Sequence, residues 1–254
     1  MDLLNDRVAL ITGSSRGIGA AIATLFAKEG AKVALHGRDE QALATVQRAI
    51  ESEVQRGRVI SVVADVTRFS EIERMRGEIE RALGPVDVLV ANAGGNSAPP
   101  GPVEEMTEDA WRNVVDANLT ATFLTLKSFL PGMKQRGRGA IVTMSSAAAR
   151  RPHEKSPVAY AAAKAGVQLL TRDVALQAGP FGIRANCITP ETIMTERNMR
   201  QIPEPMQKTL TEQHAVRRLG TPEDVARAAL FLASDQSAWI SGVMLDVAGG
   251  SVMV

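Results

Sequence analysis

Residues 8–19 read VALITGSSRGIG, an apolar run followed by glycines at positions 13, 17 and 19. The run predicts a strand, and the glycine-rich segment Thr12–Gly19 joins this strand to a helix. Such a turn lets backbone amides approach a pyrophosphate at the N-terminus of the helix. The stretch therefore predicts an α/β domain that opens with a nucleotide-binding turn.

The rest of the chain repeats this alternation, because short β-branched runs alternate with longer helical patterns. This pattern argues for parallel strands joined by helical crossovers. Capping-box patterns mark two helix starts, at Ser70 with Glu73 and at Thr221 with Asp224. We expect a single domain over residues 1–254, with a Rossmann-type, doubly wound, parallel seven-stranded sheet and helices on both faces. The predicted strands are Val8–Thr12, Lys32–His36, Val59–Val63, Val86–Ala91, Ala140–Met144, Ile183–Ile188 and Val243–Asp246.

Composition excludes several classes of protein. The net charge of +1 comes from 29 basic and 28 acidic residues, which is too balanced for a nucleic-acid binder or a membrane-surface protein. The lone Cys187 can form no internal disulfide and suits a reducing compartment. No signal pattern opens the chain, and no apolar run reaches the ~18 residues of a membrane span. We therefore expect a soluble, cytoplasmic protein, without nucleic-acid or membrane partners and without a metal site.

The most informative pair is Tyr160, the only tyrosine, and Lys164, one turn later in the helical stretch Val158–Leu170. The two side chains share a helix face. A free tyrosine titrates near ~10, and a neighbouring cation favours the phenolate and lowers the pKa. Tyr160 can then donate and accept a proton. Ser146, after the apolar run Ala140–Met144, would place a hydroxyl beside the phenol, and Ser145 is the alternative.

Together these motifs resemble the short-chain dehydrogenase/reductase family, over essentially Arg7–Gly250. The family motifs appear in order as Thr12–Gly19, Asn92-Ala93-Gly94, Asn118, Ser146 and Tyr160–Lys164. Any one of them alone would be a weak signal, but five in this order are specific. The resemblance implies an enzyme that transfers hydride between a nicotinamide cofactor and a carbonyl compound or secondary alcohol.

The resemblance also assigns roles to residues. Ser146 would polarise the carbonyl, and Tyr160 would deliver the proton. Lys164 would lower the pKa of the phenol and bind the ribose, and Asn118 would open its helix to hold a relay water. The cofactor-binding residues that it implies are Gly13, Ser15, Arg16, Gly17, Ile18, Gly19, Arg38, Asp65, Val66, Asn92, Ala93, Gly94, Tyr160, Lys164, Pro190, Ile193 and Thr195.

The end of the second strand bears on the choice of cofactor. Gly37 stands where NAD-preferring relatives carry aspartate, and Arg38 follows it. Arg16 is a second cation that the resemblance places near the same phosphate. Asp39 argues the other way, but it precedes the helical pattern Glu40–Arg56 and is better read as the N-cap of that helix. We predict NADP(H), with NAD(H) as the alternative.

The substrate region departs from the family. Pro190-Glu191 replaces the usual proline-glycine, which places a carboxylate near the expected nicotinamide. The segment 189–220 is rich in Met, Pro and Arg and fits a lid, in which Pro203 and Pro205 would interrupt any regular helix. A basic cluster of Arg150, Arg151, His153 and Lys155 could meet an anionic substrate but is better read as a solvated charge run.

These features favour a ketoreductase for a medium-sized, mainly apolar carbonyl compound. An activity like that of 3-oxoacyl-carrier-protein reductase is one possibility. The alternatives are an NAD-dependent alcohol or sugar dehydrogenase and a nucleotide-sensing regulator that has lost turnover. The resemblance suggests a homotetramer, to which the apolar run Ile240–Val254 could contribute unless it is a core strand.

Overall fold

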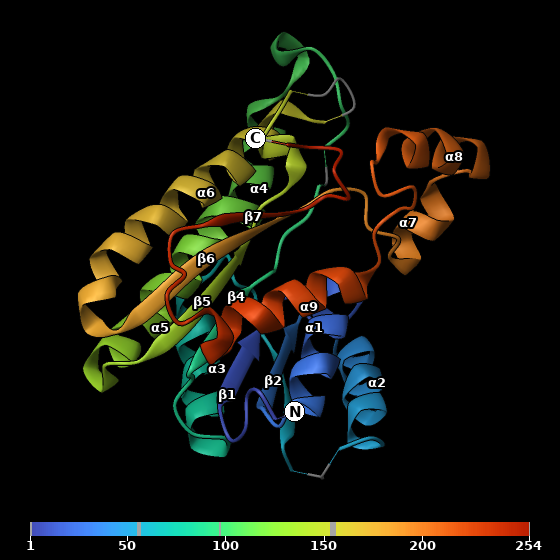
Figure 1. Ribbon diagram of the computed structural model, residues 1–254. Coiled ribbons are helices and arrows are strands. Elements are labelled where there is room, and N and C mark those ends of the chain that lie inside the picture. Colours follow the sequence, from blue (N-terminus) through green and yellow to red (C-terminus); the bar gives the residue numbers. More distant parts are fainter. Residues whose placement is uncertain (1, 55–56, 97, 153–155, 254) are drawn as a thin grey trace.

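The computed structural model describes residues 2–54, 57–96, 98–152 and 156–253, which form a seven-stranded parallel sheet (Figure 1). Its order is β3-β2-β1-β4-β5-β6-β7. Every predicted strand is confirmed to within two residues at each end, because the β-branched runs are the buried strands of a parallel sheet. The strands are β1 (Val8–Ile11), β2 (Lys32–Gly37), β3 (Val59–Val63), β4 (Val88–Ala91), β5 (Gly139–Met144), β6 (Ile183–Pro190) and β7 (Met244–Val247).

Helices cover both faces of the sheet (Figure 1). One layer consists of α1 (Gly17–Lys28), α2 (Glu40–Glu51) and α9 (Pro222–Ala233). The other consists of α3 (Phe69–Ala82), α5 (Ala121–Arg136) and α6 (Val158–Ala178), with α4 (Glu108–Val115) preceding α5.

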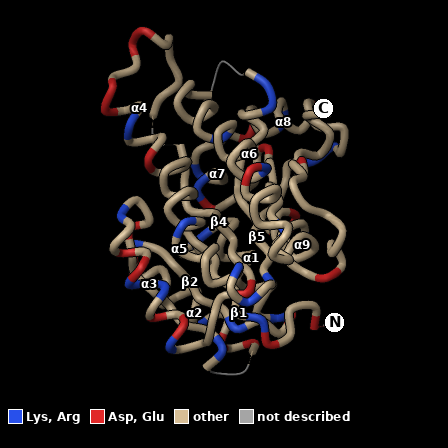
Figure 2. Tube along the Cα trace, turned by 90° about the vertical axis from the view of Figure 1, so that its left-hand side faces the viewer, with Lys and Arg blue, Asp and Glu red and all other residues tan. Residues whose placement is uncertain are grey.

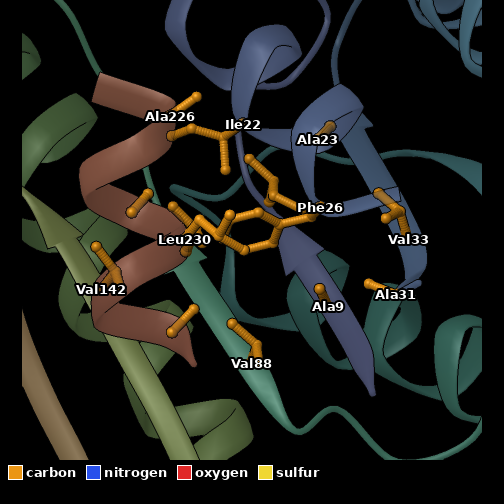
Figure 3. Close-up of a cluster of buried hydrophobic side chains, with 14 of the residues drawn as sticks. Ala9, Ile22, Ala23, Phe26, Ala31, Val33, Val88, Val142, Ala226 and Leu230 are labelled. Carbon is orange, nitrogen blue, oxygen red and sulfur yellow. The ribbon is translucent and has the colours of Figure 1, made fainter. Parts of the chain in front are cut away.

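Each face of the sheet has its own apolar cluster. Ala9 and Ile11 of β1 pack on the α1 side and Val8 and Leu10 on the other, as the alternation of side chains along a strand requires. Phe26 of α1 lies in the middle of the first cluster (Figure 3). The doubly wound, single-sheet architecture predicted from the sequence is confirmed.

Of the two predicted capping boxes, one is confirmed and one is wrong. Thr221 caps α9, because its backbone N–H donates to Asp224 at 2.8 Å and its hydroxyl accepts from the Asp224 amide. Ser70 is not an N-cap, since α3 already begins at Phe69. Its expected partner Glu73 instead bonds Arg76 on the same helix and the hydroxyl of Ser128 on α5. These two partners, of which only Ser128 is distant in sequence, take the place of the capping box.

The segment 189–220 forms two short helices that project from the body, α7 (Glu196–Gln201) and α8 (Glu204–Gln213) (Figure 1). Pro203 separates them as expected, but Pro205 lies in the first turn of α8, where a missing N–H costs nothing. The base of the segment is closed, since the Met194 amide donates to the carbonyl of Gly220 at 2.8 Å. The two helices therefore project as one segment whose two ends are hydrogen-bonded to each other at its base.

Charges of both signs are interspersed along the chain trace (Figure 2). The predicted N-cap Asp39 is confirmed, because its carboxylate accepts from the Ala42 amide at 3.0 Å. The predicted helix end at Arg56 lies outside the described residues, and α2 ends at Glu51. In the parts of the chain that the structure describes, no helix has the length and apolar character needed to cross a membrane.

Candidate active site

A cleft of about 1140 Å³ opens at the carboxyl ends of β1, β4, β5 and β6. The chain reverses its direction across the sheet between β1 and β4, which is where doubly wound folds bind ligands. The predicted site residues that line the cleft are Gly13, Arg16, Gly17, Ile18, Gly19, Asn92, Gly94, Ser146, Tyr160, Lys164, Pro190, Ile193 and Thr195. The other predicted residues are not among the lining residues of the cleft, namely Ser15, Arg38, Asp65, Val66, Ala93 and Asn118.

The glycine-rich turn is shaped for close approach. A Cβ on Gly19 would lie 2.3 Å from the carbonyl oxygen of Gly13, and a Cβ on Gly13 would lie 2.9 Å from the Cα of Ala93. Helix α1 begins at Gly17, and the side chain of its N-cap Arg16 makes no capping hydrogen bond. The first-turn amides of a helix have no partners within it, so those of α1 point toward the cleft as donors for an anion.

Asn92 fastens this turn to the end of β4. Its Nδ2 donates to the carbonyl oxygens of Thr12 and Gly13 at 3.0 and 3.1 Å. The Thr12 hydroxyl in turn accepts from the amides of Asn92 and Ala93, both at 3.0 Å. The N-A-G motif thus holds the glycine-rich turn in place, and Asn92 and Gly94 also line the cleft.

Asn118 lies in a π-helical turn, Asp116–Thr120, between α4 and α5, so the expected opening of the helix is confirmed. Its side chain is fully buried and pairs with the backbone of Gly95, with the Gly95 amide 3.0 Å from Oδ1 and the Gly95 carbonyl 2.9 Å from Nδ2. Nδ2 also donates to the carbonyl of Val114. The pairing with Gly95, two residues beyond the N-A-G alanine, was not apparent from the sequence.

Ser145 and Ser146 both line the cleft, but their hydroxyls have different partners. The Ser145 hydroxyl donates to the carbonyl of Lys164 at 2.8 Å and accepts from Gln168 at 3.1 Å. Ser146 lines the same cleft as Tyr160, and its hydroxyl accepts a hydrogen bond from the Ala148 amide at 3.2 Å. The structure therefore favours Ser146 as the hydroxyl that meets a substrate.

Lys164 is buried below the phenol, with Nζ 5.6 Å from the centroid of the Tyr160 ring. Nζ donates to the carbonyl oxygen of Met144 at 2.9 Å. Burial lowers the pKa of this amine to about 8, against a smaller opposing effect of Cys187. The predicted helical pair is confirmed as a neighbouring pair whose cation lies over the ring.

The prediction that Lys164 lowers the pKa of Tyr160 is wrong for the side chains as the structure arranges them. Burial raises the pKa of Tyr160, the hydrogen bond with Ser146 lowers it, and the carboxylate of Glu191 raises it further. The ammonium of Lys164 is directed at Met144 and does not offset the burial of the phenol. One helical turn fixes the neighbourhood of the two side chains but not the direction of the ammonium.

A family model described as enoyl-(acyl carrier protein) reductase matches residues 13–251. The chain belongs to the short-chain dehydrogenase/reductase family. It is 36% identical over 248 residues to a subunit of (2S)-[(R)-hydroxy(phenyl)methyl]succinyl-CoA dehydrogenase of Thauera aromatica, with 97% of each chain covered. Glucose 1-dehydrogenase 2 of Bacillus subtilis is 34% identical, with 98% of this chain and 96% of the relative covered.

A solved structure agrees with these relatives. The 3-oxoacyl-[acyl-carrier protein] reductase of Brucella melitensis with bound NAD has a TM-score of 0.91 and 33% identity, covering 100% of this chain and 94% of that one. Members of the short-chain dehydrogenase/reductase family are oxidoreductases that act on CH–OH or C=O groups and bind a nicotinamide cofactor. The turn without side chains at Gly13 and Gly19 and the uncapped start of α1 fit such a dinucleotide.

Strand β2 ends at Gly37, the position at which the sequence predicts the choice of cofactor. A Cβ on Gly37 would lie 3.2 Å from the Cβ of Ser15. An aspartate at position 37 would therefore crowd Ser15. Arg38 is exposed, and Arg16 forms an ion pair with Asp39.

Asp65, the predicted adenine contact, forms a turn in which its carboxylate accepts from the Thr67 amide and hydroxyl. Burial raises the pKa of Asp65, but these bonds and the charges of Arg38 and Arg68 outweigh it and hold the pKa below the usual value. Asp65 is therefore an anion beside Arg38, and its contact with adenine stays a prediction.

Glu191 is the departure from the family that the sequence shows. The residue is half-buried, lines the cleft and accepts a hydrogen bond from the hydroxyl of its neighbour Thr192. Its backbone amide donates to the carbonyl of Val247 on β7. The negative charge of Glu191 adds to burial in raising the pKa of Tyr160. This carboxylate therefore influences a predicted catalytic residue.

The basic cluster is divided by the structure. Arg150 binds Asp246 of β7 through both Nε and Nη2, at 3.1 and 2.9 Å. Asp246 also accepts from the Thr189 hydroxyl. Arg150 is thereby occupied, and Arg151 lines the cleft. The other two members, at positions 153 and 155, lie outside the described residues.

The segment that contains α7 and α8 begins against the glycine-rich turn. A Cβ on Gly17 would lie 3.2 Å from Cγ2 of Thr195, and the Thr195 hydroxyl caps α7 by accepting from the Asn198 amide. From α7 onward the cleft is lined by Arg197, Arg200, Ile202, Met206 and Leu210, among others. The sequence missed one residue near the cofactor turn, His36, whose buried ring gave no motif signal.

Proposed function

We propose that this chain is an NADP(H)-linked ketoreductase, in which Ser146 and Tyr160 receive the carbonyl oxygen of the substrate. The observation that carries the proposal is that Ser146, Tyr160 and Lys164 line the same cleft as the glycine-rich turn. Ser146 would polarise the carbonyl and Tyr160 would deliver the proton, as a positioned general acid. The nicotinamide, when bound, supplies or accepts the hydride.

Lys164 would support the proton transfer from below. The buried amine of Lys164, whose pKa is about 8, is mostly protonated at neutral pH and lies over the ring of Tyr160. Cofactor ribose hydroxyls in the cleft would give Nζ a partner in place of the Met144 carbonyl. The π-turn at Asn118 would hold the backbone of Gly95 and order a water for the relay to Lys164.

The preference for NADP(H) rests on Arg16, Gly37 and Arg38. A guanidinium fork pairs well with a 2′-phosphate, and Gly37 leaves no carboxylate to repel one. Asp39 supports the second candidate, an NAD-dependent dehydrogenase, because its carboxylate lies at the end of β2 beside Arg16. Asp39 is also engaged as the cap of α2, which favours the first candidate.

The substrate that we propose is a medium-sized, mainly apolar carbonyl compound. Ile202, Met206 and Leu210 line the outer part of the cleft from the α7–α8 segment, which would act as a lid. Methionine adapts to varied apolar shapes. A 3-oxoacyl thioester is one member of this class, and a relative whose name is that of a CoA-thioester dehydrogenase agrees with it.

We also propose a homotetramer. Large apolar side chains are exposed at Trp111, Phe123 and Leu176 on α4, α5 and α6, and at Trp239 and Met253 toward the C-terminus. Exposed apolar side chains of this kind suit burial in contacts between copies of the chain. Part of the run Ile240–Val254 is the sheet strand β7, as the alternative reading expected.

The test is a screen of NADPH oxidation across ketoacyl thioesters, steroids, sugars and small ketones, with the Tyr160→Phe protein as the matched control. Turnover of an apolar ketone that disappears in the control supports the proposal. Turnover of a sugar with NAD⁺ would favour the second candidate. Cofactor binding without turnover of any compound would favour a nucleotide-sensing regulator.

A further inference from the structure

The imidazole of His36 joins the glycine-rich turn to the loop that follows β3. His36 lies near the end of β2 and is 2% exposed. Its Nδ1 accepts a hydrogen bond from the backbone N–H of Gly13 at 3.1 Å, and its Nε2 lies 3.1 Å from the carbonyl oxygen of Ala64. One ring thus bridges the phosphate turn and the loop that carries Asp65.

One protonation form of the imidazole satisfies both contacts. The Gly13 N–H is a donor, so Nδ1 must carry a lone pair, and the Ala64 carbonyl is an acceptor, so Nε2 must carry the proton. An imidazolium would oppose two N–H groups at Gly13. Burial lowers the pKa of His36 to about 4, while the Ala64 carbonyl and the charge of Asp65 raise it and Arg38 lowers it. The ring is therefore neutral at physiological pH.

The backbone of His36 holds the next residue of the turn. The Ser14 amide donates to the His36 carbonyl at 2.8 Å, and the His36 amide donates to the Ser14 hydroxyl at 2.9 Å. The amides of Gly13 and Ser14 are thus both taken, so an anion would meet the amides that follow them in the turn and in the first turn of α1. On its other side Gly13, with φ of 68°, abuts Ala93.

We propose that His36 is a positioning residue of the cofactor site, whose neutral imidazole fixes the Gly13 amide and ties the phosphate turn to the Ala64–Val66 loop. The residue acts through Gly13 and does not itself reach the cleft. Its loss should therefore appear in cofactor affinity and not in turnover at saturating cofactor. The inference depends on the nicotinamide cofactor of the family and is independent of the proposed substrate.

Three substitutions separate the two contacts. His36→Leu removes both, His36→Asn places a carboxamide oxygen near the position of Nδ1, and His36→Gln reaches toward Ala64. Because a buried donor without a partner is costly, the leucine variant should bind NADPH and NADH at least about tenfold more weakly. The asparagine variant should recover most of the affinity, and the glutamine variant should recover less. The KM for cofactor should rise while kcat stays within about twofold.

Ser237→Ala is the control for a general loss of stability. Ser237 is buried, and its hydroxyl lies 3.0 and 3.1 Å from the carbonyl oxygens of Leu232 in α9 and Ser234 just after it, away from the cleft. This variant should lose stability without losing cofactor affinity. If His36→Leu binds cofactor like the wild type, or if asparagine gives no recovery over leucine, the proposal is wrong.

A spectroscopic measurement on the unmodified protein decides the matter even if the leucine variant does not fold. Nitrogen-15 spectra of histidine-labelled protein, assigned by the loss of the His36 signals in His36→Asn, should show an unprotonated Nδ1 and a protonated Nε2 at pH 7. An Nδ1–H tautomer or an imidazolium at that pH would overturn the proposal.

Discussion

Nη2 of Arg16 lies 3.1 Å from Oδ2 of Asp39, so an ion pair connects the phosphate turn with the end of β2. Both side chains are at least half exposed, and such pairs contribute little to stability. The pair is therefore free to exchange partners, and a 2′-phosphate would compete with Asp39 for the same guanidinium.

Asp39→Ser should shift the cofactor preference toward NADPH. Serine retains an N-cap for α2 but removes the charge that holds Arg16, so the ratio of the NADH and NADPH dissociation constants should rise by up to about fivefold. Binding titrations with both cofactors measure this ratio, and Arg38→Asp should move it the opposite way. A tighter complex with NADH than with NADPH in the wild type would refute the predicted preference.

Tyr160→Phe should lower turnover at least ~10²-fold and leave cofactor binding nearly unchanged, because the variant lacks only the positioned acid. Steady-state rates and cofactor titrations measure the two quantities. Ser146→Ala should also reduce turnover strongly. Ser145→Ala should reduce it less, because the Ser145 hydroxyl is hydrogen-bonded to the backbone carbonyl of Lys164 and to the side chain of Gln168. Equal losses in the two serine variants would contradict this assignment.

Glu191→Gln should lower the pKa of Tyr160, because the carboxylate at this position raises it. The change removes a negative charge that disfavours the phenolate. Tyr160 is the sole tyrosine, so a titration followed by ultraviolet absorbance reports it alone. Glu191→Asp, which retains the charge, is the control and should move the midpoint less. A midpoint that stays or rises in the glutamine variant would show that the charge does not act on the phenol.

His36 should make stability dependent on pH in the range between its unfolded pKa, about 6.5, and its folded pKa, about 4. In this range the unfolded chain binds a proton that the folded protein does not, so the free energy of unfolding decreases as the pH falls. The shift corresponds to about 3 kcal/mol. Urea denaturation at pH 7 and pH 4.5 should show a smaller decrease for His36→Asn than for the wild type, and parallel decreases would be the contrary result.

Closure of the α7–α8 segment over bound substrate should slow proteolysis at Arg197 and Arg200. Both residues line the cleft and belong to a segment that is attached by one narrow base. Lid closure excludes water from the reacting groups. Trypsin cleavage near these arginines should become slower with cofactor and substrate together than with either alone. Equal rates under all conditions would exclude a lid.

The sheet was predictable because its strands are short, β-branched and buried, so their signal depends on local sequence alone. The same holds for Asp39 and Thr221, whose capping partners lie three residues away. The prediction failed at Ser70 because Glu73 finds Arg76 and Ser128, and the second of these is distant in sequence.

The candidate site shows the same division. The family motifs placed Ser146, Tyr160 and Lys164 together, since each motif follows a strand that ends at the cleft. The direction of the Lys164 ammonium and the role of His36 depend on the carbonyls of Met144 and Ala64, which no side-chain pattern encodes. Backbone partners across strands were therefore the part that the sequence did not reveal.

The two hydrogen bonds that Arg150 donates to Asp246 also mark a boundary for exchanging the loop that follows. They anchor the chain four residues beyond Ser146 to strand β7, and Asp246 in turn bonds Thr189 at the end of β6. A designer who exchanges the substrate-facing loop for one of another length can graft after Arg150 and keep the geometry of Ser146 and Tyr160. A graft that starts before Arg150 would remove this anchor from the turn that carries Ser146.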